Sequence, residues 1–190
     1  MPDLYGVFPY LPDARVDEPG GPLYLPLQGG GRLDNPDLYS VFYAGDTEAG
    51  AIAEAFGRFP EWAAAILEGS PALPGSYRAI ARYRMDPTIA ICNLDEPAQL
   101  AALGLRPSDV VSGAYARTRE WARRLFQDGR WGGVRWWSYY DPRWSSFGIW
   151  ATGAISLADV RRLTFADAAL LEAARSIARS VTGRSERRPQ

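Results

Sequence analysis

The most regular alternation of apolar and polar positions lies between Tyr77 and Met85. Tyrosine, alanine and methionine occupy every second position there, and three of the four positions between them hold arginine. A period of two is typical of a β-strand with one buried and one exposed face. The pattern therefore predicts an antiparallel strand at an edge or on a face of a sheet.

Apolar and aromatic runs predict further strands, because such runs are bounded by turn-forming residues. They cover residues 39–43, 88–94, 134–140 and 147–151. The segment 1–37 is rich in proline and glycine and is predicted to be irregular, with at most short strands at 4–8 and 23–25.

Helices are predicted where apolar residues recur every three or four positions, or where capping residues precede such a run. The predicted helices are one that is capped by Asp46 and Thr47 and reaches Phe56, and others at 61–68, 97–103, 112–128 and 167–181. A glycine follows each of the first four, and glycine readily ends a helix. The first two are expected to form a helical hairpin.

These strands and helices do not alternate regularly, which favours an α+β fold with a central, partly antiparallel sheet and helices around it. A chain of 190 residues with 47% apolar residues is long enough for one core and short for two. We therefore expect a single domain over residues 1–181 and a flexible polar tail at 182–190.

Composition excludes several kinds of chemistry. The chain contains no histidine and one cysteine, Cys92, so it can form neither a Ser-His-Asp triad nor a Cys-x-x-Cys pair. Without imidazole, no metal site is predicted. Cys92 stands in the apolar run 88–94 and is expected to be a small buried core residue rather than a nucleophile.

Charge and hydropathy do not indicate binding to nucleic acid or to a membrane. The charges of the 22 acidic and 21 basic residues nearly cancel, so no strong electrostatic field attracts the chain to nucleic acid or to an anionic membrane. No apolar run approaches the roughly 20 residues that span a bilayer. The first residues are acidic and interrupted by proline, unlike an export signal, so we expect a soluble cytoplasmic protein.

Three segments carry candidate site residues, and the first is the glycine run 29–31 with Arg32. Consecutive glycines let a ligand approach the backbone, and the Arg32 guanidinium can make paired hydrogen bonds to phosphate oxygens. A flexible loop without a ligand explains the same composition. The segment also lacks the spacing of a Walker loop or of a dinucleotide-binding loop.

The second segment is the predicted helix that carries Glu54. Alanine and glycine surround this carboxylate and leave room for a ligand. A carboxylate so placed can stabilise the positive charge that develops when a glycosidic bond breaks. An exposed surface glutamate is the alternative interpretation.

The third segment, 132–147, contains three tryptophans and Ser138. Aromatic surfaces beside a hydroxyl suit a stacked nucleobase or nicotinamide ring, although core packing of alternate strand residues explains much of the same composition. With neither histidine nor lysine to activate it, Ser138 is expected to donate or accept a hydrogen bond rather than to act as a nucleophile.

Together these segments resemble the RES domain. The order is Gly30-Gly31-Arg32, an aromatic strand ending at Tyr43, a helix with Glu54, and a strand with Ser138 after Gly132-Gly133. The resemblance runs from about Gly29 to Trp150. Arg32, Glu54 and Ser138 match the three residues that give the family its name.

The resemblance implies a fold similar to that of ADP-ribosyltransferase toxins, and an NAD+ phosphorylase or NAD+ glycohydrolase. NAD+ is then the substrate, inorganic phosphate or water is the acceptor, and no cofactor is required. The resemblance also implies the toxin of a toxin–antitoxin pair, with an antitoxin of the helix-turn-helix type. Transfer of ADP-ribose to a macromolecule, and a non-catalytic module that binds a nucleotide or a carbohydrate, are the alternatives. The aromatic-rich composition leaves scope for a homo-oligomer.

On this resemblance, Arg32, Glu54 and Ser138 are the expected catalytic residues, with Glu54 near the nicotinamide ribose. Arg32, Tyr43 and Ser138 are the expected residues in contact with the dinucleotide. Family members often have an arginine in the first strand, where this chain has Gly6. The side chains that could supply the missing anion contact are those of Arg15, Arg82 and Arg84.

Overall fold

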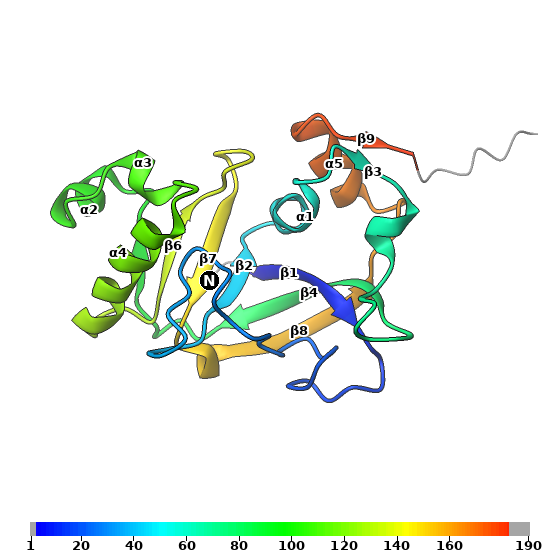
Figure 1. The fold of residues 1–190 in the computed structure, drawn as a ribbon, viewed down its shortest axis with the longest axis horizontal. Helices are drawn as coiled ribbons and strands as arrows, with labels where there is room; N and C mark the ends of the chain where they lie inside the picture. Colours follow the sequence, from blue (N-terminus) through cyan, green and yellow to red (C-terminus); the bar gives the residue numbers. More distant parts are fainter. Residues whose placement is uncertain (1–2, 183–190) are drawn as a thin grey trace, which may run out of the picture.

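The computed structural model describes residues 3–182 and is built on a seven-stranded mixed sheet (Figure 1). The strands lie in the order β5-β6-β7-β2-β1-β4-β8. β5 and β6 are parallel, and every other neighbouring pair is antiparallel. The sheet strands are β1 Leu4–Tyr10, β2 Phe42–Gly45, β4 Tyr77–Met85, β5 Ile91–Asn93, β6 Gly133–Trp137, β7 Ser145–Ile149 and β8 Ile155–Arg162.

Helices gather at two places on this sheet. The α-helices are α1 Glu48–Phe56, α2 Pro97–Ala102, α3 Pro107–Val110, α4 Tyr115–Asp128 and α5 Ala168–Ser176. In Figure 1, α2, α3 and α4 lie beside the end formed by β5 and β6, whereas α1 and α5 lie near the half formed by β1, β4 and β8. This arrangement confirms the predicted α+β fold.

Each group of helices has its own core. In one core, Leu125 of α4 is buried with Cys92 of β5. In the other, Ile52 of α1 and Leu170 of α5 are buried with Ile80 of β4. Cys92 is thus a core residue, as predicted, and burial raises the pKa of its thiol to about 11.

α1, the helix that carries Glu54, begins and ends where the sequence predicts. Thr47 caps it, since its Oγ1 accepts a hydrogen bond from the Gly50 backbone N–H at 3.0 Å. Most of its small residues serve close packing: a Cβ added at Gly50 would lie 3.1 Å from the Cβ of Trp144. Ala51 and Ala55 differ, since both line a cavity with Glu54.

The predicted helix at 61–68 is wrong, and with it the helical hairpin. The chain instead forms a short strand, β3 (Glu61–Trp62), and a 3₁₀ helix, η1 (Ala64–Leu67). Trp62 is fully buried, its indole N–H donates to the Phe56 carbonyl at 3.2 Å, and β3 pairs with β9 (Ser180–Val181). Burial of one large side chain and pairing with a distant strand outweigh the local helical pattern.

The carboxyl-terminal third differs from the prediction in two further ways. The predicted helix 167–181 ends at Ser176, because the backbone then turns through Ala178, which has φ 53°, into β9. The strand β8, which the pattern did not indicate, forms an edge of the sheet. Its residues are mostly half-buried or exposed, so the apolar signal is weak. Earlier in the chain, the pattern also did not indicate the short helix α3.

β4 forms over the predicted residues Tyr77–Met85, and the other predicted strands, except one, are confirmed with changed bounds. The run 39–43 gives a strand that begins at Phe42, and the run 88–94 gives only β5. No strand forms at 23–25, a loop in which Leu23 donates its backbone N–H to the Val16 carbonyl. Apart from Thr182, the predicted tail lies outside the described residues. Within residues 3–182, no helix combines the length and apolar character needed to cross a membrane.

Truncation of Trp62 tests the role of β3 in the core. We expect Trp62→Ala to lower the free energy of unfolding by about 3–5 kcal/mol, since it removes a fully buried aromatic side chain. Urea unfolding followed by circular dichroism measures the change. The control is Tyr139→Ala, whose side chain is 72% exposed and whose loss should change stability by less than about 0.5 kcal/mol. Equal effects of the two substitutions would contradict the assignment.

Candidate active site

Glu54 and Ser138, which are far apart in the sequence, are in direct contact. The Ser138 hydroxyl donates a hydrogen bond to Oε1 of Glu54 at 2.6 Å. Ser138 follows β6 and is 2% exposed, and its Oγ accepts from the Tyr140 backbone N–H at 3.1 Å. Glu54 is exposed on α1, so the buried serine fixes the orientation of an accessible carboxylate.

A second serine, Ser146, reaches the same carboxylate oxygen, and sequence reasoning missed it. Its hydroxyl donates to Oε1 of Glu54 at 3.3 Å. Ser146 lies on β7 opposite Trp136 of β6. Ser146 lies in the aromatic segment 132–147, but no sequence signal singles it out. Only the pairing of β6 with β7 places it beside Glu54.

Glu54 lines a cavity of about 190 Å³ between α1 and the sheet. Its walls are small residues of α1 and aromatic residues of the sheet, among them Tyr43, Trp136 and Phe147. A carboxylate held by two hydroxyls beside aromatic surfaces can face a flat ring and a developing positive charge at once.

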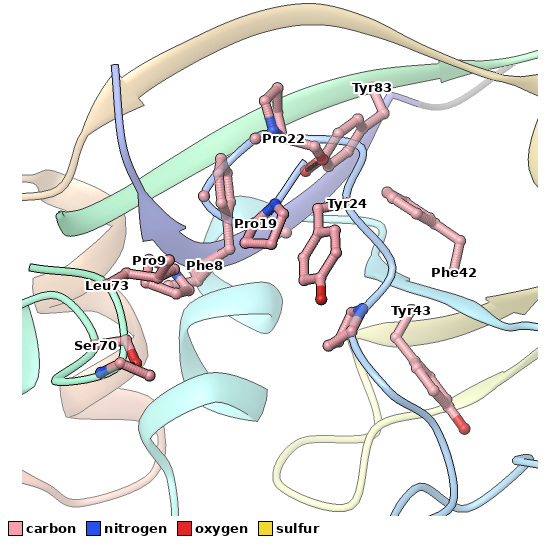
Figure 2. Close-up of a pocket in the computed structure, with 16 residues that line it drawn as sticks. Phe8, Pro9, Pro19, Pro22, Tyr24, Phe42, Tyr43, Ser70, Leu73 and Tyr83 are labelled. Atoms are coloured by element: carbon pink, nitrogen blue, oxygen red, sulfur yellow. Dashed lines mark hydrogen bonds between the residues drawn. The ribbon is translucent and has the colours of Figure 1, made fainter. Parts of the chain in front are cut away.

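A larger, mostly apolar cavity of about 470 Å³ adjoins the first and shares Gly6, Val7 and Tyr43 with it. Figure 2 shows Phe8, Pro19 and Tyr24 gathered over β1, with Tyr43 to one side. The irregular segment before β2 thus forms a wall of the cavity, which gives a structural role to the proline-rich residues.

A third cavity, of about 490 Å³, contacts Glu54 from another side. It shares Val7, Glu54 and Ala55 with the small cavity, and its lining includes Arg58 and Arg78. Glu54 therefore stands between an aromatic space and a space with two guanidinium groups.

Tyr43 is fixed through its hydroxyl. It donates to Oδ1 of Asp34 at 2.7 Å and accepts from the Leu33 backbone N–H at 2.9 Å. Burial, together with the hydrogen bond to Asp34, raises the pKa of Tyr43 above its ordinary value. The phenol therefore stays protonated at neutral pH and contributes its ring to both cavities.

Asp34 also orders the glycine run that precedes it. Its Oδ2 accepts hydrogen bonds from the backbone N–H groups of Gly29 (2.8 Å) and Gly31 (2.6 Å). Burial alone raises the pKa of this carboxyl, but the hydrogen bonds from Tyr43, Gly29 and Gly31 and the charge of Arg119 outweigh burial, and the pKa is lowered. The run is thus a structured loop in this protein.

Arg32 is not brought into the cavities that contain Glu54. Its Nη1 donates to the carbonyls of Val110 and Ser112, each at 2.7 Å, and its guanidinium lies 5.4 Å from the centre of the Tyr115 ring. Within residues 3–182, its Nε and Nη2 donate no hydrogen bond to the protein. Of the four expected site residues, the structure thus joins Glu54, Ser138 and Tyr43 and sets Arg32 apart.

None of the three arginines considered as replacements for an arginine at Gly6 lines the cavities around Glu54. Arg15 pairs with Asp17 and Glu18, both on the surface, Arg82 pairs with Asp3 at 3.2 Å, and Arg84 is exposed. Gly6 itself lines both the small and the apolar cavity. A Cβ there would lie 3.2 Å from the buried ring of Tyr83, so the space favours glycine.

The sequence and the fold both have counterparts among known proteins. The family model of the RES domain matches residues 15–175. No curated protein matches the sequence. A solved structure of similar fold is a chain in the crystal structure of the M. tuberculosis MbcT–MbcA toxin–antitoxin complex, with 15% sequence identity and a TM-score of 0.60. The match covers 93% of this chain and 89% of that chain.

The Asp34 network makes stability depend on pH. Because the folded-state pKa lies below the unfolded value of about 3.9, the carboxylate stabilises the fold above that pH and loses this effect as pH falls through the folded-state pKa. We expect Asp34→Asn to lower the free energy of unfolding by about 1–3 kcal/mol at neutral pH. Urea unfolding at several pH values measures the difference. The control is Asp37→Asn in the same loop, where the side chain is exposed. A deficit that stays constant into the acid range would contradict the prediction.

Proposed function

Since this chain belongs to the RES-domain family, we propose that it is an enzyme that cleaves the bond between nicotinamide and ribose in NAD+. The observation that carries the proposal is the Glu54 carboxylate, which two serine hydroxyls hold at the edge of an aromatic cavity. Cleavage of an N-glycosidic bond develops positive charge on the ribose ring. A carboxylate positioned before the reaction stabilises that charge without a cost of reorganisation.

The neighbouring cavities suit the two ends of a dinucleotide. The small cavity takes the nicotinamide and its ribose, with Tyr43 and Trp136 as aromatic walls. The larger apolar cavity takes the adenine end, because Phe8 and Tyr24 offer aromatic surface there. Tyr43 lines both spaces and therefore contacts the substrate near its middle.

Ser138, Arg32 and the acceptor have separate roles in the proposed reaction. Ser138 positions the carboxylate, since its hydroxyl donates to Glu54 and its side chain is buried away from the substrate space. Family membership, rather than the cavities, assigns Arg32 to the diphosphate: it lines none of the three cavities, and its Nε and Nη2 donate to none of residues 3–182. The leaving nicotinamide takes the bonding electron pair and becomes neutral, so this step uses no metal ion. Phosphate or water accepts the ADP-ribosyl group.

Removal of the carboxylate charge tests the proposal. We expect Glu54→Gln to lower the rate of nicotinamide release from NAD+ by about 100-fold or more, as is usual when an electrostatic stabiliser is lost. Chromatography of reactions with and without inorganic phosphate measures the release. The matched control is Glu68→Gln, an exposed glutamate outside the three cavities, which should retain wild-type activity.

Near-normal turnover by Glu54→Gln would exclude the assigned role. If wild-type protein bound NAD+ in a calorimeter but released no nicotinamide, the chain would be a nucleotide-binding module instead. A mass increase of one ADP-ribose on a protein or nucleic acid would identify transfer to a macromolecule.

We further propose that the chain is the toxin of a toxin–antitoxin pair and is held inactive by an antitoxin protein. The support is its membership of the RES-domain family and its similarity in fold to a chain of the MbcT–MbcA toxin–antitoxin complex. An antitoxin would prevent turnover if it covered the open side of the cavities near Glu54.

Expression in growing bacteria tests this second proposal. We expect wild-type protein to lower cellular NAD+ several-fold and to stop growth, because the activity consumes a shared cofactor. Glu54→Gln at equal expression should do neither. Enzymatic cycling assays of NAD+ and colony counts give the two measurements. Unchanged NAD+ and growth with a protein that is active in vitro would argue against a toxin.

A further inference from the structure

The third cavity contains two arginines that the proposed roles above do not use. Arg58 follows α1, and Arg78 lies near the start of β4, opposite Pro9 of β1. Both line the space that also contacts Glu54. One lies after the end of a helix and the other lies on a strand of the sheet, so the fold brings together two residues that are 20 positions apart in the sequence.

The described residues give the Arg78 guanidinium neither a carboxylate partner nor a hydrogen bond to its Nε. Its Nε is buried and has no hydrogen-bond partner among the described residues. Burial, and next the charge of Arg58, lower the pKa of Arg78. The neighbouring like charge is unfavourable, and an anion bound between the two guanidinium groups would relieve it.

Eight arginines of residues 3–182 form salt bridges with carboxylates. Arg161 contacts Glu48 and Asp167, and Arg143 contacts Asp141. Within residues 3–182, neither Arg58 nor Arg78 forms a salt bridge, although the exposed Glu61 also lines their cavity. The positive charges of Arg58 and Arg78 are therefore available to an anion in the third cavity.

We propose that Arg78 and Arg58 bind the inorganic phosphate that accepts the ADP-ribosyl group, an inference that rests on the function proposed above. Glu54 lines both the small cavity and this one, so a phosphate bound here lies next to the reaction centre. Two guanidinium groups offset the repulsion between a phosphate dianion and the Glu54 carboxylate. Their planar donors also match phosphate oxygens.

The reaction balances without a further reactant. One oxygen of HPO₄²⁻ forms a bond to the anomeric carbon of the nicotinamide ribose while the bond from that carbon to the ring nitrogen breaks. The electron pair of the broken bond stays on the nitrogen, which loses its positive charge. The products are nicotinamide and ADP-ribose 1″-phosphate.

The experiment measures nicotinamide release and the ratio of ADP-ribose 1″-phosphate to ADP-ribose as inorganic phosphate is varied. We expect Arg78→Met to raise the phosphate concentration for half-maximal release by about 10-fold or more and to shift the product toward ADP-ribose. Arg58→Met, which removes an exposed side chain and should not disturb folding, is expected to act in the same direction. Arg84→Met is the matched control, because Arg84 is an exposed arginine of the same strand.

The outcomes separate this inference from the function on which it rests. Nicotinamide release that does not depend on phosphate, or Arg78→Met and Arg58→Met proteins with a wild-type phosphate response, would overturn the site and leave NAD+ cleavage intact. A raised KM for NAD+ with an unchanged phosphate response would assign the arginines to a phosphate group of the dinucleotide instead. If the wild type released no nicotinamide, calorimetric titration with inorganic phosphate would still test whether Arg78 and Arg58 bind phosphate. Binding that Arg78→Met abolishes and Arg84→Met retains supports the site, and absence of binding by the wild type overturns it.

Discussion

The hydrogen bond from Ser138 to Glu54 is the contact on which the candidate site depends, because it joins a helix to a strand end that is 84 residues away. Ser138 is buried and its own position is fixed by the backbone of β6 and of Tyr140. Glu54 is exposed and would otherwise sample many rotamers. Hydrogen bonds to a charged acceptor are stronger than neutral ones, so this bond holds the carboxylate in one orientation. Orientation before reaction is what makes an electrostatic stabiliser effective.

The order of strands in the sheet explains why this carboxylate meets the other residues of the site. β7, β2 and β1 are neighbours, so Ser146, Tyr43 and Gly6 lie across three adjacent strands beneath α1. The chain between β1 and β2 is long and rich in proline, and it forms one wall of the apolar cavity. Asp34 ties that connection to β2 through Tyr43. The site is thus assembled mainly by antiparallel pairing rather than by residues close in sequence.

The sequence predicts the elements that carry strong local signals and fails where distant contacts decide. α1 is predicted at both ends. Thr47 caps its start locally, whereas Gly57 keeps helical angles and is required because Tyr140 lies against it. The segment 61–68 has a helical pattern, but burial of Trp62 and pairing with β9 make it a strand and a 3₁₀ turn. The same limit applies to the site. The motif order indicated Glu54 and Ser138, whereas Ser146 required knowledge of the register between β6 and β7.

In the proposed reaction, the leaving nicotinamide and the incoming acceptor differ in charge, and the residues on the two sides of Glu54 differ in the same way. On one side lie aromatic walls and Gly6, which carries no side chain. On the other side lie Arg58 and Arg78. A flat ring that becomes neutral as it leaves gains little from positive charge, whereas an anionic acceptor requires it. β1 contains no arginine, but Arg58 and Arg78 supply positive charge in the third cavity. That cavity is where the proposed phosphate acceptor would bind.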